Sequence, residues 1–97
     1  MWILRGQPDS EPLTFRIQSG AIKTVGRASR ADFIVDAALV SRLHCRLTAS
    51  NDSLEVEDLK STNGTFVNDK RIERATLADG DRLRVGRFEL KVELQPS

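Results

Sequence analysis

The chain of 97 residues contains a single cysteine, Cys45, and a single histidine, His44. One cysteine excludes an internal disulfide and any metal site built from several cysteines. A lone thiol also fits a reducing compartment, so we expect a cytoplasmic protein. The apolar run nearest the start of the sequence, 2–4, is too short for a signal peptide or a membrane span. We therefore expect no contact with a membrane.

An excess of charge of one sign is also missing. The sequence has 15 Lys and Arg against 14 Asp and Glu, which gives a net charge of +1. General nucleic-acid binders carry a basic excess, and they use aromatic side chains to stack on bases. Aromatic residues make up 5% of this chain, so we expect no nucleic-acid partner. Any anion-binding site must therefore be a local group of residues rather than a property of the whole surface.

The motifs of the common enzyme classes are absent from the sequence. There is no G-x-x-x-x-G-K-[ST] phosphate loop, no cluster of metal ligands and no convincing acid–base pair. Period-two alternation puts His44 and Cys45 on opposite faces of a strand, which argues against a cysteine–histidine nucleophile pair. We therefore predict a protein that is not an enzyme, with no catalytic residue, no metal and no cofactor.

What the sequence does have is period-two alternation of apolar and polar residues. The clearest run is 88–94, where Phe88, Leu90, Val92 and Leu94 are separated by charged residues. Such alternation predicts strands with one buried face, and no stretch has helical periodicity over three turns. Turn-forming residues lie at 6–10, 19–20, 50–53, 63–64, 68–69 and 79–81. The predicted strands are 2–5, 13–17, 21–25, 32–35, 44–48, 54–58, 65–67, 71–72, 76–78, 82–85 and 88–94.

Many short strands with regular turns predict an all-β fold, either an antiparallel sandwich or a barrel. Residues 1–97 form a single domain with a core from about 2 to 94, because no linker, repeat or low-complexity segment divides them. The chain is either a whole small protein or the N-terminal domain of a longer one.

Three short motifs fall on the predicted loops. Gly26-Arg27 ends a strand, 41–44 (Ser-Arg-Leu-His) precedes one, and 60–68 joins two strands through Asn63-Gly64. A guanidinium offers a fork of donors suited to phosphate oxygens, and hydroxyl and amide groups supply further donors. Taken singly, each motif has a simpler interpretation: a solvated arginine, a histidine hydrogen-bonded to backbone, and a hairpin turn.

In combination, the order and spacing of the three motifs resemble those of the forkhead-associated (FHA) domain. The run 77–86 resembles another signature of that family, Leu-x-x-Gly-Asp-x-apolar-x-apolar-Gly. The resemblance covers about 2–94. It implies an antiparallel β-sandwich of about eleven strands, with the termini close together and the binding loops at the opposite end.

The resemblance also implies roles for individual residues. By matching motif, Arg27 and Ser41 are the phosphate-binding pair, and Arg42 holds a position that is often basic and can touch the phosphate. Thr62 matches a hydroxyl near the phosphate, and Asn63 an asparagine that hydrogen-bonds the peptide main chain. The positions that shape or support the loops are Gly26, His44 and Gly64, with Asn68 either supporting the loops or touching the peptide.

The function implied is that of a signalling adaptor or regulator, because the family reads phosphothreonine in partner proteins. The expected partner is a threonine-phosphorylated protein, a kinase or its substrate, bound by a monomer. Arg30 or Lys60 would then favour an acidic residue beside the phosphothreonine. The alternative is a phosphate-independent interaction domain or intramolecular regulator that binds its partner through another face of the sandwich.

Overall fold

The computed structural model describes residues 1–6 and 13–96, so most of the turn expected at 6–10 lies outside the described residues. All eleven predicted strands are present, and their ends lie within two residues of the expected ones. The strands are β1 (Trp2–Gly6), β2 (Leu13–Ile17), β3 (Ile22–Gly26), β4 (Phe33–Ile34), β5 (Cys45–Ala49), β6 (Leu54–Asp58), β7 (Thr65–Val67), β8 (Lys70–Ile72), β9 (Arg74–Leu77), β10 (Arg82–Val85) and β11 (Phe88–Leu94).

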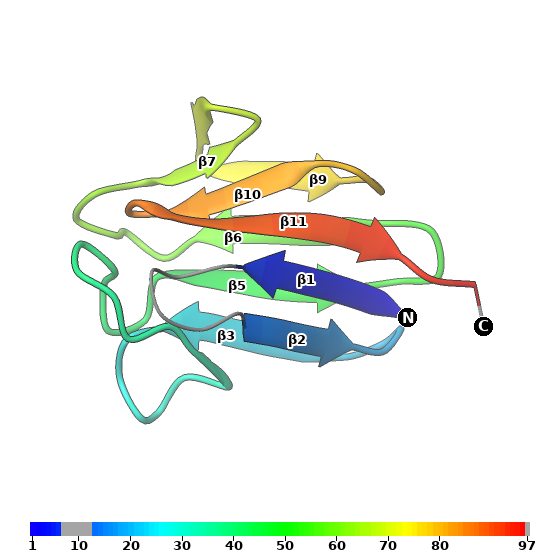
Figure 1. Cartoon of the computed structure of the whole chain (residues 1–97), viewed down its shortest axis with the longest axis horizontal. Coiled ribbons are helices and arrows are strands. Elements are labelled where there is room, and N and C mark those ends of the chain that lie inside the picture. Colours follow the sequence, from blue (N-terminus) through cyan, green and yellow to red (C-terminus); the bar gives the residue numbers. More distant parts are fainter. Residues whose placement is uncertain (7–12, 97) are drawn as a thin grey trace.

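These strands form two sheets packed face to face, which confirms the predicted sandwich (Figure 1). The six-stranded sheet has the order β2-β1-β11-β10-β7-β8, and the five-stranded sheet has the order β4-β3-β5-β6-β9. The described chain contains no helix long and apolar enough to cross a membrane.

Two details differ from the sequence prediction. β4 runs parallel to β3, although only residues 27–32 connect them and a parallel pair normally needs a longer crossover. β9 begins at Arg74, two residues earlier than expected, because Arg74 continues the antiparallel ladder opposite Glu57 of β6. The Arg74 guanidinium also lies 3.7 Å from the Glu57 carboxylate.

The core lies between the sheets and contains the apolar residues of the alternating runs. In β5 the residues Cys45, Leu47 and Ala49 are buried while the residues between them are exposed. Trp2 is fully buried, and its indole nitrogen donates to the carbonyl of Ser50. Burial raises the pKa of the Cys45 thiol to about 12, which keeps it protonated and chemically inert. Each fully buried aliphatic side chain of the core, such as Leu47, stabilises the fold by about 1.5–3 kcal/mol.

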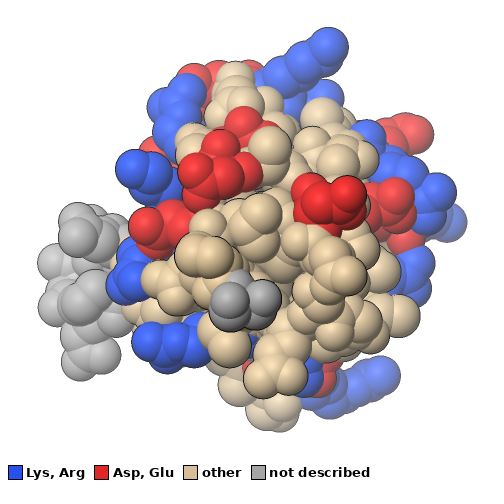
Figure 2. Space-filling view, turned by 90° about the vertical axis from the view of Figure 1, so that its right-hand side faces the viewer, with Lys and Arg blue, Asp and Glu red and all other residues tan. Residues whose placement is uncertain are grey.

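The two termini lie together at one end of the sandwich, as expected. The amide of Gln95 donates to the carbonyl of Met1 at 2.9 Å. Figure 2 views this end: uncharged residues fill much of its middle, and Lys and Arg lie towards the rim. The loops that follow β3 and β6 lie at the opposite end (Figure 1).

A substitution at Gly26, the last residue of β3, tests how tightly the loop end of the sandwich is packed. A Cβ added there would lie 2.0 Å from the carbonyl oxygen of Arg42, which accepts a hydrogen bond from the amide of Ala28. We expect Gly26→Ala to lower the free energy of unfolding by about 1–3 kcal/mol in urea denaturation, because backbone must move. Gly20→Asn is the control: nothing lies within 4 Å of Gly20, and asparagine tolerates its positive φ. Equal losses in both variants would contradict this packing.

Candidate functional site

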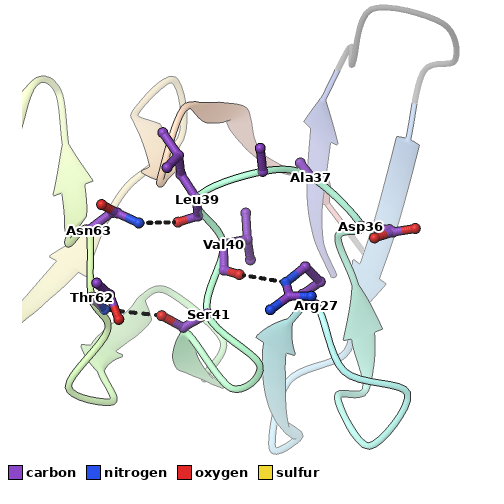
Figure 3. Close-up of a pocket in the computed structure, with 9 residues that line it drawn as sticks. Arg27, Asp36, Ala37, Leu39, Val40, Ser41, Thr62 and Asn63 are labelled. Carbon is purple, nitrogen blue, oxygen red and sulfur yellow. Dashed lines mark hydrogen bonds between the residues drawn. The ribbon is translucent and has the colours of Figure 1, made fainter.

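A pocket of about 540 Å³ opens at the loop end of the sandwich. Its walls come from the end of β3, from the segment between β4 and β5, and from the β6–β7 loop (Figure 3). It brings together four residues that the sequence analysis singled out, Arg27, Ser41, Thr62 and Asn63. The full lining is Arg27, Asp36, Ala37, Ala38, Leu39, Val40, Ser41, Thr62 and Asn63.

Arg27 directly follows β3, and its position is fixed at two points. Its amide donates to the carbonyl of Ser41 at 2.9 Å, and its Nε donates to the carbonyl of Val40 at 3.1 Å. The bond at Nε orients the guanidinium plane. Within the part of the chain that the structure describes, the two terminal nitrogens have no hydrogen-bond partner. They remain donors for an oxyanion in the pocket.

Ser41 is oriented in a way that leaves its hydroxyl hydrogen available. The amide of Thr62 donates to Ser41 Oγ at 3.1 Å, and this bond joins two of the segments that line the pocket (Figure 3). Because Oγ accepts in that bond, the hydroxyl can still donate its own hydrogen to a ligand. Ser41 and Thr62 therefore form a second group of donors facing the same space as Arg27.

His44 is fully buried and forms hydrogen bonds to Ser41 and Gly64, which lie in two different loops at this end of the sandwich. Its Nδ1 accepts from the amide of Ser41 at 3.0 Å, which places the ring proton on Nε2. Nε2 then donates to the carbonyl of Gly64 at 2.8 Å. Both ring nitrogens are thus occupied by backbone, as expected of a structural histidine, and neither is available to activate a nucleophile.

Asn63 lines the pocket on the side of the β6–β7 loop (Figure 3). Its Nδ2 donates to the carbonyl of Leu39 at 3.1 Å, which fixes the amide and leaves Oδ1 free of partners among the described residues. The following residue, Gly64, has φ of +94°, and its amide donates to Ser61 Oγ at 3.0 Å. Glycine accommodates this left-handed turn without strain, so the turn aims Asn63 across the pocket.

Asp58, the last residue of β6, orders this turn and was not identified from the sequence. Its carboxylate accepts from the amide and the hydroxyl of Ser61, at 3.1 and 2.5 Å, and from the Thr65 hydroxyl at 2.7 Å. Partial burial would raise the pKa of Asp58, but these hydrogen bonds outweigh it and hold the pKa below its ordinary value of 3.8. An aspartate three residues before a serine was the available signal.

Arg42 and Asn68 were also predicted to belong to the site, and both lie outside the pocket lining. The Arg42 side chain is exposed, and its carbonyl accepts from the amide of Ala28. Asn68 donates to Asp81 at 3.1 Å and accepts from the Arg82 amide at 3.0 Å, so it fixes the β7–β8 turn against the start of β10. Asn68 therefore supports the β7–β8 turn, and its contact with a peptide stays a prediction.

Residues 36–40 form a wall of the pocket and were not predicted from the sequence to belong to the site. Four of the five are small or apolar and match no binding motif, so no sequence signal marked them. Across residues 1–6 and 13–96, no three His, Cys, Asp or Glu side chains lie together as a metal site. The donors of Arg27 and Ser41 that line the pocket are suited to an oxyanion.

Comparison with known proteins agrees with this geometry. The FHA domain model matches residues 23–86, which include all the residues of the pocket. The chain belongs to the FHA family. A solved structure from a study of phosphothreonine-dependent FHA domain interactions is 32% identical, with a TM-score of 0.89, and the match covers 99% of this chain and 98% of that one.

Two curated relatives come from Mycobacterium tuberculosis. The glycogen accumulation regulator GarA is 39% identical over 70 residues, which are 72% of this chain and 43% of GarA. The ABC transporter ATP-binding/permease protein Rv1747 is 38% identical over 78 residues, which are 80% of this chain and 9% of the transporter. The chain thus spans less than half the length of either relative.

We predict that Asp58→Asn lowers the free energy of unfolding by about 1–3 kcal/mol at neutral pH, because three donors lose a charged acceptor. A carboxylate with a lowered pKa stabilises the fold above pH 3.8, and this contribution is lost as the pH falls through the folded-state pKa. The stability of the unmodified chain should therefore approach that of the variant in acid.

Urea denaturation from neutral pH down through pH 3.8 measures this convergence. Asp52→Asn, in the exposed β5–β6 turn, is the matched control and should follow the unmodified chain at every pH. Curves for Asp58→Asn that run parallel to the unmodified chain into acid would show that the carboxylate charge does not hold the turn.

Proposed function

We propose that this FHA domain binds phosphothreonine-containing segments of partner proteins and catalyses no reaction. The observation that carries the proposal is the convergence of unsatisfied donors on one pocket. The terminal nitrogens of Arg27 and the hydroxyl of Ser41 face the same space and are already oriented by other bonds. The Thr62 side chain lies next to Ser41 (Figure 3).

A phosphothreonine meets these donors with matching chemistry. It carries about −1.5 to −2 charges at neutral pH and three strong acceptor oxygens. The Arg27 guanidinium supplies a positive charge and two terminal nitrogens as donors. Ser41 and Thr62 supply neutral hydroxyl donors. Asn63 Oδ1 is placed to accept an amide hydrogen from the peptide main chain.

The arrangement favours affinity because the donors are ordered before a ligand arrives. Fixing a flexible side chain at an interface costs about 0.5–1.5 kcal/mol. Arg27 is held by the Val40 carbonyl, Ser41 by the Thr62 amide, and Asn63 by the Leu39 carbonyl. Much of that ordering cost is therefore met in folding rather than in binding.

The relatives support the same reading. A structure at 32% identity comes from work on phosphothreonine-dependent FHA interactions, and GarA is named as a regulator. We infer that this domain acts as an intracellular adaptor or regulator, as a monomer. Its partner is a threonine-phosphorylated protein, either a kinase or a kinase substrate.

Isothermal calorimetry with paired phosphorylated and unphosphorylated peptides tests the proposal. We expect binding of the phosphothreonine peptide alone. Arg27→Ala and Ser41→Ala should each weaken it about 10- to 100-fold, because a hydrogen bond to a charged group contributes about 1.5–3 kcal/mol. Arg46→Ala is the control: this arginine pairs with Glu57 on an outer sheet face and should leave affinity unchanged.

Unfolding midpoints of the variants should stay close to that of the unmodified chain, so that lost binding reports the site. Equal affinity for the two peptides would contradict the proposal. So would an Arg27→Ala variant that binds the phosphorylated peptide as well as the unmodified chain does, because a partner would then be using another face of the sandwich.

A further inference from the structure

Asn63 and Gly64 form a pair whose chemistry the binding role does not use. The chain contains three asparagines, Asn51, Asn63 and Asn68, and all three are exposed. Asn63 alone precedes a glycine, whereas the other two precede aspartates. An asparagine is most reactive towards the next peptide nitrogen when a glycine follows, because no Cβ blocks the approach and the backbone bends freely. Deamidation is therefore a reaction to which this chain is open chiefly at Asn63.

The reaction needs only water. The amide nitrogen of Gly64 attacks Cγ of Asn63, so that a C–N bond forms and closes a succinimide ring. The bond between Cγ and Nδ2 breaks, and Nδ2 leaves as ammonia with the proton of the Gly64 amide. A water molecule then opens the ring at either carbonyl, which leaves an aspartate or an isoaspartate at position 63. No atom is oxidised or reduced.

The folded turn keeps both reacting groups engaged with other partners. The buried amide of Gly64 donates to Ser61 Oγ at 3.0 Å, and the Ser61 hydroxyl donates in turn to Asp58. The side chain of Asn63 is held separately, because its Nδ2 donates to the Leu39 carbonyl at 3.1 Å. The Gly64 nitrogen must give up its hydrogen and turn towards Cγ before it can attack, so its bond to Ser61 has to break first.

The product of deamidation carries a charge in the lining of the pocket. An aspartate in place of Asn63 loses the Nδ2 donor, and its carboxylate then faces the Leu39 carbonyl with no hydrogen between the two acceptors. A phosphothreonine carries about −1.5 to −2 charges, so a new anion at this position opposes its binding. An isoaspartate also adds a carbon to the main chain between residues 63 and 64, in the turn that His44 holds.

We propose that Asn63 is a site of spontaneous deamidation, that the hydrogen bond between the Gly64 amide and Ser61 sets its rate, and that the modification ends phosphate binding. The last part rests on the proposed function, and the first two parts do not. The bonds that order the turn for a ligand thus also determine how long the site stays intact.

Peptide mapping of the aged chain by mass spectrometry tests the rate. Trypsin releases residues 61–70, which hold both Asn63 and Asn68, and residues 47–60, which hold Asn51. In mildly alkaline buffer the folded chain should gain the deamidation mass at Asn63 before either other asparagine. The rate should be about tenfold lower than in a synthetic peptide of residues 61–70, which lacks the bond to Ser61 of the folded turn. An equal rate in chain and peptide, or earlier modification at Asn51 or Asn68, overturns the proposal.

Substitution of Ser61 isolates the effect of its hydroxyl. Ser61→Ala removes the acceptor of the Gly64 amide and should speed deamidation of Asn63 about tenfold. Ser53→Ala is the matched control: it removes a hydroxyl that bonds to Ser50 in the β5–β6 turn, and the rate at Asn63 should not change. An unchanged rate in Ser61→Ala contradicts the proposal, and so does a lower one, which would mean that Ser61 relays the amide proton to Asp58.

Urea denaturation keeps this comparison independent of the variant's stability. The unfolding midpoint shows whether Ser61→Ala is compared as a folded chain. The unmodified chain in denaturing urea loses the same hydrogen bond and should deamidate at Asn63 as fast as the synthetic peptide in the same urea. A rate that stays at the folded value would contradict the control by Ser61.

Affinity for the phosphothreonine peptide used in calorimetry tests the consequence. The aged chain is passed over the immobilised peptide, and both fractions are mapped. Chains modified at Asn63 should collect in the unbound fraction, and Asn63→Asp should bind about tenfold more weakly than the unmodified chain. Equal retention of modified and intact chains overturns the loss of binding but leaves the rate difference. A fresh chain that binds phosphorylated and unphosphorylated peptides equally overturns the proposed function, and the loss of phosphate binding falls with it.

Discussion

The site depends above all on one buried imidazole. His44 accepts from the Ser41 amide and donates to the Gly64 carbonyl, and so it joins two loops that are 20 residues apart in the chain. Because the ring is fully buried, water does not replace either bond if it is lost, and an unpaired backbone group would remain. Ser41 and the Asn63-Gly64 turn therefore keep their separation only while His44 stays in place.

A series of hydrogen bonds next to His44 connects β6 to the groups that line the pocket. Asp58 ends β6 and holds Ser61, and the Ser61 hydroxyl accepts from the Gly64 amide. Gly64 in turn places Asn63 against the Leu39 carbonyl. The series begins at Asp58 on β6, so the packed sandwich helps to hold the exposed donors in place without a ligand.

Much of this structure could be predicted from the sequence, for identifiable reasons. Period-two alternation marks strands such as β11 directly, because one face of each sheet is buried. Arg27, Ser41, Thr62 and Asn63 could be grouped because the order and spacing of their motifs resemble those of the FHA domain. Asp58 and residues 36–40 could not, since their roles depend on backbone contacts between distant segments. The parallel β3–β4 pair depends likewise on how residues 27–32 fold back.

The central claim is that His44 and its neighbours present one preformed phosphate site at the loop end of the sandwich. An NMR titration with a phosphothreonine peptide tests it most directly, by following the backbone amide resonances. We predict that the large shifts fall on residues 27–28, 39–42 and 62–64 and that strand amides on the outer sheet faces stay unmoved. The same peptide without phosphate should cause no shift. Shifts centred on an outer sheet face, or equal shifts with both peptides, would contradict the account.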